Sequence, residues 1–314
     1  MLAARQSDSG PRLLADRLVG QARFHEGRFP EAVALYRTAI AGYDPLEHRE
    51  LMHRYGQDNR VAAGCYLSFA IWMLGFPEQG ARAAEEALER ARGLAHPTTT
   101  AYALFIGVAI TNICLRRPER VEHAARESLH LAKALSLSLF HGYAQIHLGW
   151  ALSELGSATG YGEIEDGLRE KHQAGAQRFE QLDQSLAADA YSRAGRHNEA
   201  LTSISRAFES LALGGDKAFA AELHRKRALL LLRADRSAHD AAEADLQRAL
   251  AIARQQSALS LELRAARDLA RLWSERGERQ QAADLLAPIY AAFTEGFHTP
   301  DLQESKALLA ELTN

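Results

Sequence analysis

An internal repeat of about 40 residues is the feature that most constrains the fold of this 314-residue chain. Each unit reads as a helix with periodic apolar residues, a short polar turn and a second helix rich in alanine. The aligned turns fall at Gly27, Gly75, Arg116, Gly156, Gly195, Ser237 and Gly277, with successive spacings of 48, 41, 40, 39, 42 and 40 residues. A single helix hairpin cannot bury its apolar face alone, so this period predicts stacked hairpins that share a continuous core.

Proline placement supports an all-α chain. No proline occurs between Pro118 and Pro288, and alanine and leucine dominate that interval. Proline breaks helices, whereas alanine and leucine lose little conformational freedom in them. The sequence shows no strand-like alternation of any length.

The first unit carries the clearest repeat signature. Small Gly20 permits two helices to approach closely, and Phe24 fills the space beside it. Gly27 turns the chain, and the residues that then face back onto the first helix are Phe29, Ala32, Tyr36 and Ala39, with Pro45 ending the unit. These residues resemble the tetratricopeptide repeat (TPR), although the period of 40 exceeds the usual 34.

This resemblance predicts an all-α, right-handed superhelical solenoid of about seven TPR-like hairpins with a C-terminal capping helix. Residues 1–16 are expected to form a polar tail or the start of the first helix, and residues 17–314 a single array. The expected units lie near 17–45, 58–95, 98–136, 139–173, 177–212, 217–256 and 259–296, with the cap at 300–314.

Two units depart from the pattern. The third has Arg116 where glycine is usual. The fourth contains the run SATGYGEIEDGL, and its glycine-rich turn around Gly160 and Gly162 predicts a looser corner.

Bulk properties narrow the location and the partners. The net charge of −3 gives no global attraction to nucleic acid or to an anionic membrane. Cys65 and Cys114 lie in apolar runs, which fits buried thiols of a cytoplasmic protein better than a disulfide. The stretch Tyr102–Leu115 is too short for the ~20 residues of a membrane span, so no membrane partner is expected.

Four segments carry a more specific likeness: RYGQDNRVAA (54–63), HLGWALSELG (147–156), AELHRKRALLLL (221–232) and FTEGFHTPDLQESKALL (293–309). They resemble the C-terminal helical-repeat region of large bacterial signalling ATPases, in which cyclase or winged-helix domains often precede the NTPase; the maltose regulator is similar. The resemblance implies an NTPase or output domain as a partner, in cis or in trans. The chain itself contains no GxxxxGK[ST] phosphate loop.

The sequence predicts no catalytic, cofactor or metal site. His123 and His130 share one helix face, but no HExxH or paired CxxC motif accompanies them. Neither cysteine has the sequence context of a nucleophile.

The first helix of each hairpin is instead expected to line a groove that receives a ligand or partner. The expected groove residues are Tyr66, Phe69, Trp72, Ile106, Ile110, Tyr143, His147, Trp150, Asp189, Arg193, His224, Arg227, Arg264, Arg267 and Arg271. Such a groove is aromatic toward the N-terminal half and charged toward the C-terminal half, and both residue types are common at interfaces.

Packing alternatives stay open for these residues. The spacing of Tyr66, Phe69 and Trp72 also fits core between helices, and the same alternative holds for His147 and Trp150. Opposite charges four residues apart pair Arg264 with Asp268 and Arg271 with Glu275, which fits a solvated, self-paired face. Arg267 has no acid four residues away on either side, so it is the arginine expected to be free for a ligand.

These features favour a non-catalytic regulatory scaffold that receives a protein, a peptide or a small effector. The alternative is a structural scaffold that self-assembles through its end repeats. A third, weaker idea is an enzyme with a helical pocket near His147, Trp150 and Glu154. Nucleic-acid binding is disfavoured because acidic residues interrupt the basic segments.

Overall fold

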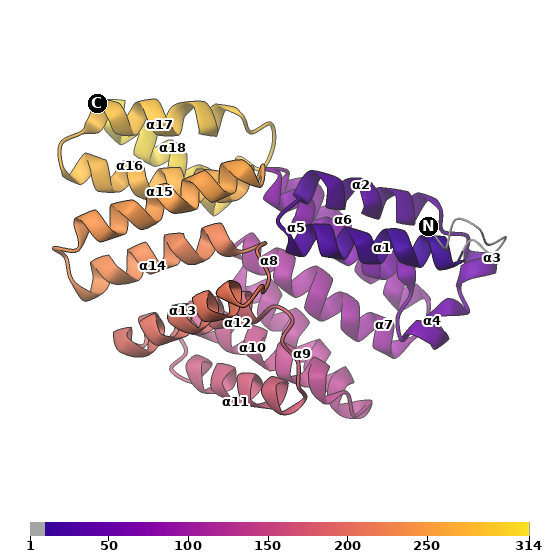
Figure 1. Cartoon of the computed structure of the whole chain (residues 1–314). Coiled ribbons are helices and arrows are strands. Elements are labelled where there is room, and N and C mark those ends of the chain that lie inside the picture. The colour runs from indigo at the N-terminus through magenta and orange to yellow at the C-terminus, as the bar shows by residue number, and fades with distance from the viewer. Residues whose placement is uncertain (1–9, 314) are drawn as a thin grey trace. The chain divides into compact units, whose positions relative to one another are not determined.

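The computed structural model describes residues 10–313 and shows helix hairpins joined by short turns, with no strand in that range (Figure 1). The chain divides into two compact units, Met1–Trp72 with Gln79–Gln177, and Met73–Glu78 with Arg178–Asn314. Residues 1–9, which make up most of the expected N-terminal tail, lie outside the described residues, and residues 10–16 are helical.

Four hairpins belong to the first unit. Three of them are α1 (Gly10–His25) with α2 (Phe29–Ala41), α5 (Asn59–Met73) with α6 (Pro77–Gly93), and α10 (Ser138–Glu154) with α11 (Gly160–Gln173). In the remaining hairpin, which lies third along the chain, the first helix consists of three consecutive segments, α7 (Pro97–Tyr102), η2 (Ala103–Ala109) and α8 (Ile110–Cys114), and it pairs with α9 (Pro118–Ala134). Two short helices, α3 (Pro45–His48) and α4 (Leu51–Tyr55), connect the first hairpin to the second. They account for the longer first spacing of 48 residues.

Three hairpins and a terminal helix belong to the second unit. They are α12 (Glu180–Arg193) with α13 (His197–Ala212), α14 (Ala220–Ala234) with α15 (His239–Gln255), α16 (Leu259–Glu275) with α17 (Arg279–Ala291), and α18 (Pro300–Thr313). The predicted all-α repeat of hairpins with a C-terminal capping helix is confirmed.

Four of the five aligned glycine turns follow one backbone design. Gly27, Gly156, Gly195 and Gly277 have φ between +74° and +86°, and the residue after each glycine donates its N–H to the carbonyl five residues earlier. This is the Schellman geometry, which ends a helix in the left-handed region. Arg116 occupies the same position with φ +56°, and Arg117 makes the equivalent bond.

The turn at Ser237 is built differently. Helix α14 ends at Asp235 in an extended conformation, and the Asp235 carboxylate accepts bonds from the N–H and the hydroxyl of Ser237 at 2.8 and 2.7 Å. An aspartate side chain therefore replaces the left-handed residue, which explains why this turn needs no glycine.

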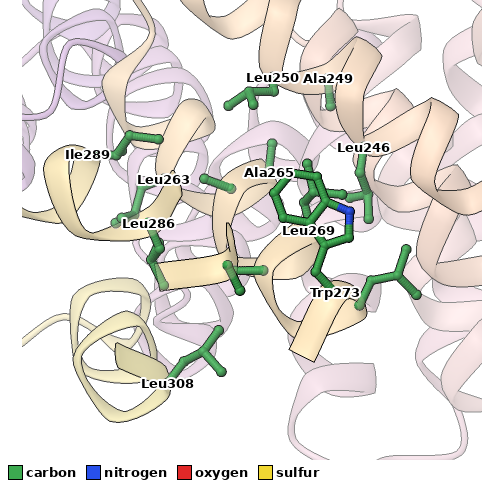
Figure 2. Packing of buried hydrophobic residues seen from close by; sticks show 14 of the residues in the cluster. Leu246, Ala249, Leu250, Leu263, Ala265, Leu269, Trp273, Leu286, Ile289 and Leu308 are labelled. Carbon is green, nitrogen blue, oxygen red and sulfur yellow. The ribbon is translucent and has the colours of Figure 1, made fainter. Parts of the chain in front are cut away.

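Small residues set the distance between paired helices, as the first unit predicts. A Cβ on Gly20 would lie 2.8 Å from the ring of Tyr36, and Phe24, Phe29 and Ala32 have no exposed surface. In the second unit the same principle fills the core around α16. Figure 2 shows Leu263, Leu269 and Trp273 of this helix among Leu246, Leu250, Leu286, Ile289 and Leu308 of the neighbouring helices.

The expectation of a loose fourth corner is wrong. Gly160 begins α11 and packs directly on α10, where a Cβ on Gly149 would lie 2.4 Å from the carbonyl oxygen of Gly160. Two helical turns before Gly149 on α10, a Cβ on Gly142 would lie 3.0 Å from the carbonyl oxygen of Gly167. Glycines cluster here because the backbones of α10 and α11 are in contact, and not because this corner is loosely packed.

The segment Pro97–Cys114 passes the length and hydropathy test for a membrane span, but 83% of it is buried within the protein. A core helix gives the same result. Within it, η2 is a π-helix, whose hydrogen bonds span five residues in place of four, and no sequence pattern indicated it. Cys65 and Cys114 are both buried thiols and form no disulfide.

The α10–α11 contact predicts opposite effects for two glycines of the fourth hairpin. Gly149→Ala is expected to destabilise the protein by about 1–3 kcal/mol, because the added methyl group meets backbone atoms that cannot move aside. The matched control is Gly162→Ala, where no atom lies within 4 Å and helix propensity favours alanine. Urea denaturation would measure both, and equal effects of the two substitutions would contradict the close contact.

Candidate functional site

The aromatic residues expected in a groove lie inside the helix packing of the first unit. Tyr66 and Phe69 are fully buried, and their rings pack on Phe24 at centroid distances of 5.8 and 4.9 Å. Trp72, Ile106 and Ile110 are at most 3% exposed. This placement matches the packing alternative that the spacing left open, and the groove role of these side chains stays a prediction.

The same holds one hairpin further along. Tyr143 stacks on Phe105 with a centroid distance of 5.2 Å and an interplanar angle of 11°, and Trp150 is 4% exposed. His147 is 1% exposed, and its Nδ1 has no hydrogen-bond partner among the described residues. Burial lowers the pKa of His147 to about 3, so the imidazole stays neutral in the folded protein.

The charged residues of the second unit form a connected set of ion pairs between first helices. We name this set the ion-pair network; it consists of Glu222 and Arg225 on α14, Arg264, Arg267 and Asp268 on α16, and Asp301 and Glu304 on α18. Every member except Glu304 has a side chain at most 13% exposed. It therefore belongs to the interior of the unit.

Arg225 and Arg264 connect α14 to α16 through two crossing contacts. Arg225 lies 2.7 Å from Glu222 on its own helix and 2.6 Å from Asp268 on α16. Arg264 of α16 returns to Glu222 at 3.4 Å. Arg264 also reaches Asp301 of α18 at 2.8 Å.

The position of Arg267 differs most clearly from the prediction made from the sequence. Arg267 was expected to be free for a ligand, but its side chain is 7% exposed and contacts Asp268, Asp301 and Glu304 at 3.1, 3.2 and 2.7 Å. A search for acids four residues away along one helix does not detect partners on the next helix. Arg271, one turn later, is exposed and forms no ion pair with any residue from 10 to 313.

Charge pairing dominates the electrostatics of the network. Burial acts to raise the pKa of Glu222, but Arg225 and Arg264 outweigh it and hold that pKa well below its ordinary value. Burial likewise opposes ionisation of Asp268, and Arg267 and Arg225 lower its pKa. Glu222 and Asp268 are therefore ionised at neutral pH, and the raised pKa values of Arg225 and Arg267 keep both guanidinium groups protonated.

A second charged cluster lies beside the network on α13, α14 and α15. Arg227 binds Asp245 with two nitrogens at 2.6 and 2.5 Å and stacks over the ring of Phe208 at 4.2 Å. His224 donates from Nδ1 to the same carboxylate at 2.8 Å. Asp189 of α12 pairs with Lys226 of α14 at 2.7 Å.

The expected charged residues thus separate into two groups. Arg264 and Arg267 are buried and hold neighbouring helices together, and His224 and Asp189 are partly buried in local pairs. Arg193 and Arg271 are exposed, and the Arg227 side chain keeps 38% of its surface accessible. Helix periodicity alone does not single out the other charged residues of these clusters, which are Glu222, Arg225, Lys226, Asp245, Asp301 and Glu304. Opposite charges one repeat apart are the sequence signal for several of them.

No group of three or more histidine, cysteine, aspartate or glutamate side chains within the described range is arranged to hold a metal ion.

Comparisons with known proteins agree with this architecture. No family profile matches the sequence. A curated protein of Rhizobium meliloti (strain 1021), described as uncharacterized, is 26% identical over 244 residues, or 77% of this chain. The chain spans about a quarter of that relative's length, 24%.

Solved structures of Rap proteins share the fold. Apo RapI matches with a TM-score of 0.55 and 14% identity, over 96% of this chain and 99% of RapI. A Rap protein complexed with competence and sporulation factor matches with a TM-score of 0.62 and 15% identity, over 99% of this chain and 79% of the other. The Rap conjugation gene regulator of plasmid pLS20, complexed with the Phr* peptide, gives 0.57 and 12%, over 98% and 77%. The fold is a TPR-like helical repeat.

The network predicts a large cost for removing one charge. Asp268→Asn leaves Arg225 and Arg267 short of a buried partner and is expected to cost about 3–5 kcal/mol at pH 7. Arg271→Gln, on the same helix but exposed, is the control and should change stability by less than about 0.5 kcal/mol. Urea denaturation would measure both.

The same network predicts acid sensitivity. The folded-state pKa values of Glu222 and Asp268 lie below their unfolded values of ~4, so their contribution is complete above pH ~4 and is lost as the pH falls further. Asp268→Asn should therefore show a shallower loss of stability between pH 4 and pH 2.5 than the unmodified protein.

His147 predicts a separate pH dependence at milder acidity. Its pKa is about 3 in the folded protein and ~6.5 in the unfolded chain, so stability is complete above pH ~6.5 and falls as the pH is lowered toward 3. At pH 5 the loss is roughly 2 kcal/mol relative to pH 7. His147→Leu should abolish that part of the loss, as measured by urea denaturation at both pH values; an unchanged difference would show that His147 is protonated when folded.

Proposed function

We propose that this protein is a non-catalytic regulatory scaffold that binds a peptide or a protein segment. The observation that carries the proposal is the fold likeness to Rap proteins over nearly the whole chain, because two of those structures contain competence and sporulation factor and the Phr* peptide. The exposed arginines of the second unit supply charged donors for such a partner.

Within this proposal, the scaffold serves a bacterial signalling NTPase or a transcriptional output, in cis or in trans, in the cytoplasm. The greater length of the Rhizobium relative leaves room for such a domain in proteins of this kind. The four segments that resemble signalling ATPases also have clear structural roles. Asp58 caps α5 by accepting from the Val61 N–H at 2.9 Å, and Asn59 accepts from buried Arg17 at 2.9 Å.

The remaining segments lie at contacts between helices as well. HLGWALSELG contains Gly149, which touches α11. The ion-pair network receives Glu222 from AELHRKRALLLL, and Asp301 and Glu304 from FTEGFHTPDLQESKALL. These acids contact Arg264 and Arg267 of α16. The resemblance therefore follows residues at contacts between helices, both within a hairpin and between neighbouring hairpins.

The proposed mechanism is a shift between arrangements of neighbouring hairpins. A ligand that contacts the first helices of two or three repeats favours the arrangement that fits it best. Buried ion pairs between those helices have strict geometric requirements, so they favour discrete arrangements over gradual bending.

Selection of ligands from a random peptide display library would test this proposal. Purified protein is expected to enrich peptides that combine acidic and apolar residues, and synthetic copies should bind in fluorescence anisotropy. Combined Arg193→Gln and Arg271→Gln should weaken binding about tenfold. The control is Arg248→Gln, an exposed arginine of the second helix α15, which should leave the affinity unchanged.

Two results would overturn the proposal. One is the absence of any enriched peptide family, or equal affinity for all three proteins. The other is steady nucleotide hydrolysis by the purified chain, since a scaffold of this kind has no turnover.

A further inference from the structure

A cleft of about 450 Å³ opens in the first unit between the end of α2 and the helices α5 and α6. Its apolar surface comes from Ile40, Leu67 and Leu94. Pockets that enclose small molecules have volumes of roughly 300–1,000 Å³, so this cleft is large enough for a small-molecule ligand.

Small residues line the part of the cleft where α5 and α6 cross. Gly64 of α5 lies tightly against Ala87 of α6, where an added Cβ would be 3.2 Å from the alanine methyl. Ala83 and Gly93 of α6 also line the cleft, and an added Cβ on Gly93 would meet no atom within 4 Å.

Arg90 forms one wall and is held in place from behind. Its guanidinium stacks over the ring of Tyr43 at 4.8 Å, and its Nε lies 3.6 Å from the buried carboxylate of Asp58. The Tyr43 hydroxyl donates to the other Asp58 oxygen at 2.5 Å. Burial and Asp58 raise the pKa of Tyr43 to about 12, so the hydroxyl keeps its proton and Arg90 keeps a fixed partner.

Three further charges line the cleft without an internal partner. Arg60 lies on α5, and Glu86 and Glu89 lie on α6; none of the three forms an ion pair or a hydrogen bond with any residue from 10 to 313. Charges of both signs therefore face one apolar surface and are available to a ligand.

We propose that this cleft binds a short zwitterionic peptide of two or three residues with apolar side chains. Its carboxylate meets Arg60, its ammonium group meets Glu86 and Glu89, and its side chains cover Ile40, Leu67 and Leu94. The uncommitted charges of both signs set the ligand class, because a neutral apolar molecule would leave them unused and a singly charged one would satisfy only one side. The site goes beyond the proposed function and does not rely on it, since it lies in the first unit.

Trileucine, N-acetyl-trileucine and trileucine amide are suitable probes, titrated into the 314-residue protein by isothermal calorimetry. Free trileucine is expected to bind at least tenfold more tightly than either blocked form. Arg60→Gln should weaken free trileucine about tenfold and leave the amide unaffected, because the amide has no carboxylate to lose. Combined Glu86→Gln and Glu89→Gln should weaken free trileucine and leave the N-acetyl form unaffected.

Two controls separate binding from folding. Arg37→Gln changes an exposed arginine of α2 that does not line the cleft and should have no effect. Ala83→Leu fills the cleft without touching a charge and should abolish binding while circular dichroism stays unchanged. Absence of trileucine binding, equal affinity for the three peptides, or insensitivity to Arg60→Gln would each overturn the proposal, and tighter binding of the amide would assign the cleft to a cation instead.

Discussion

Polar contacts between first helices, one repeat apart, hold successive hairpins of this protein in register. In the first unit they join Arg17 to Asn59, His25 to Tyr66, Asp58 to Thr99 and Ser68 to Thr111, at sequence separations of 42, 41, 41 and 43 residues. In the second they join Ser185 to Lys226, Ser192 to Arg233, Glu222 to Arg264 and Arg225 to Asp268, at 41, 41, 42 and 43. From the second hairpin on, these separations lie within three residues of the local repeat spacing, so similar positions of neighbouring first helices contact each other. Between the first two hairpins the separations of 42 and 41 are shorter than the spacing of 48 between their turns.

The two units use this geometry with different chemistry. Hydrogen bonds, one of them from Arg17, and aromatic rings join the first helices of the first unit, whereas ion pairs and hydrogen bonds from Lys226 and Arg233 join those of the second. Apolar packing stabilises the contact between two helices with little directional preference. A buried ion pair adds little net stability, but a neighbouring helix without the opposite charge would leave a buried charge unpaired at a large cost in free energy. The second unit therefore specifies the order of its helices through charge, and the cost of that specificity is sensitivity to acid.

The sequence predicted the period, the helix pairs and most turns, because glycine in the left-handed region and apolar periodicity are local properties. It failed where the deciding partner is distant. Gly160 needed the backbone of α10, and Arg267 needed acids that follow it by 34 and 37 residues. Burial of Tyr66 and Phe69 was equally undetermined, since the spacing of aromatic residues is the same for a core and for a groove.

The charge pairing of the second unit also bears on how such an array can change during evolution. Repeat proteins commonly gain and lose whole hairpins by duplication and deletion. Loss of α14 and α15 here would place Arg264 and Arg267 beside α12, whose buried polar side chains include Gln181, Gln184 and Ser185, and would remove the Glu222 carboxylate. Arg264 would keep only Asp301 of α18, and Arg267 would keep Asp268 of its own helix with Asp301 and Glu304 of α18. The hairpins of this unit are therefore not interchangeable modules, and we expect the number and order of its repeats to be inherited as a block.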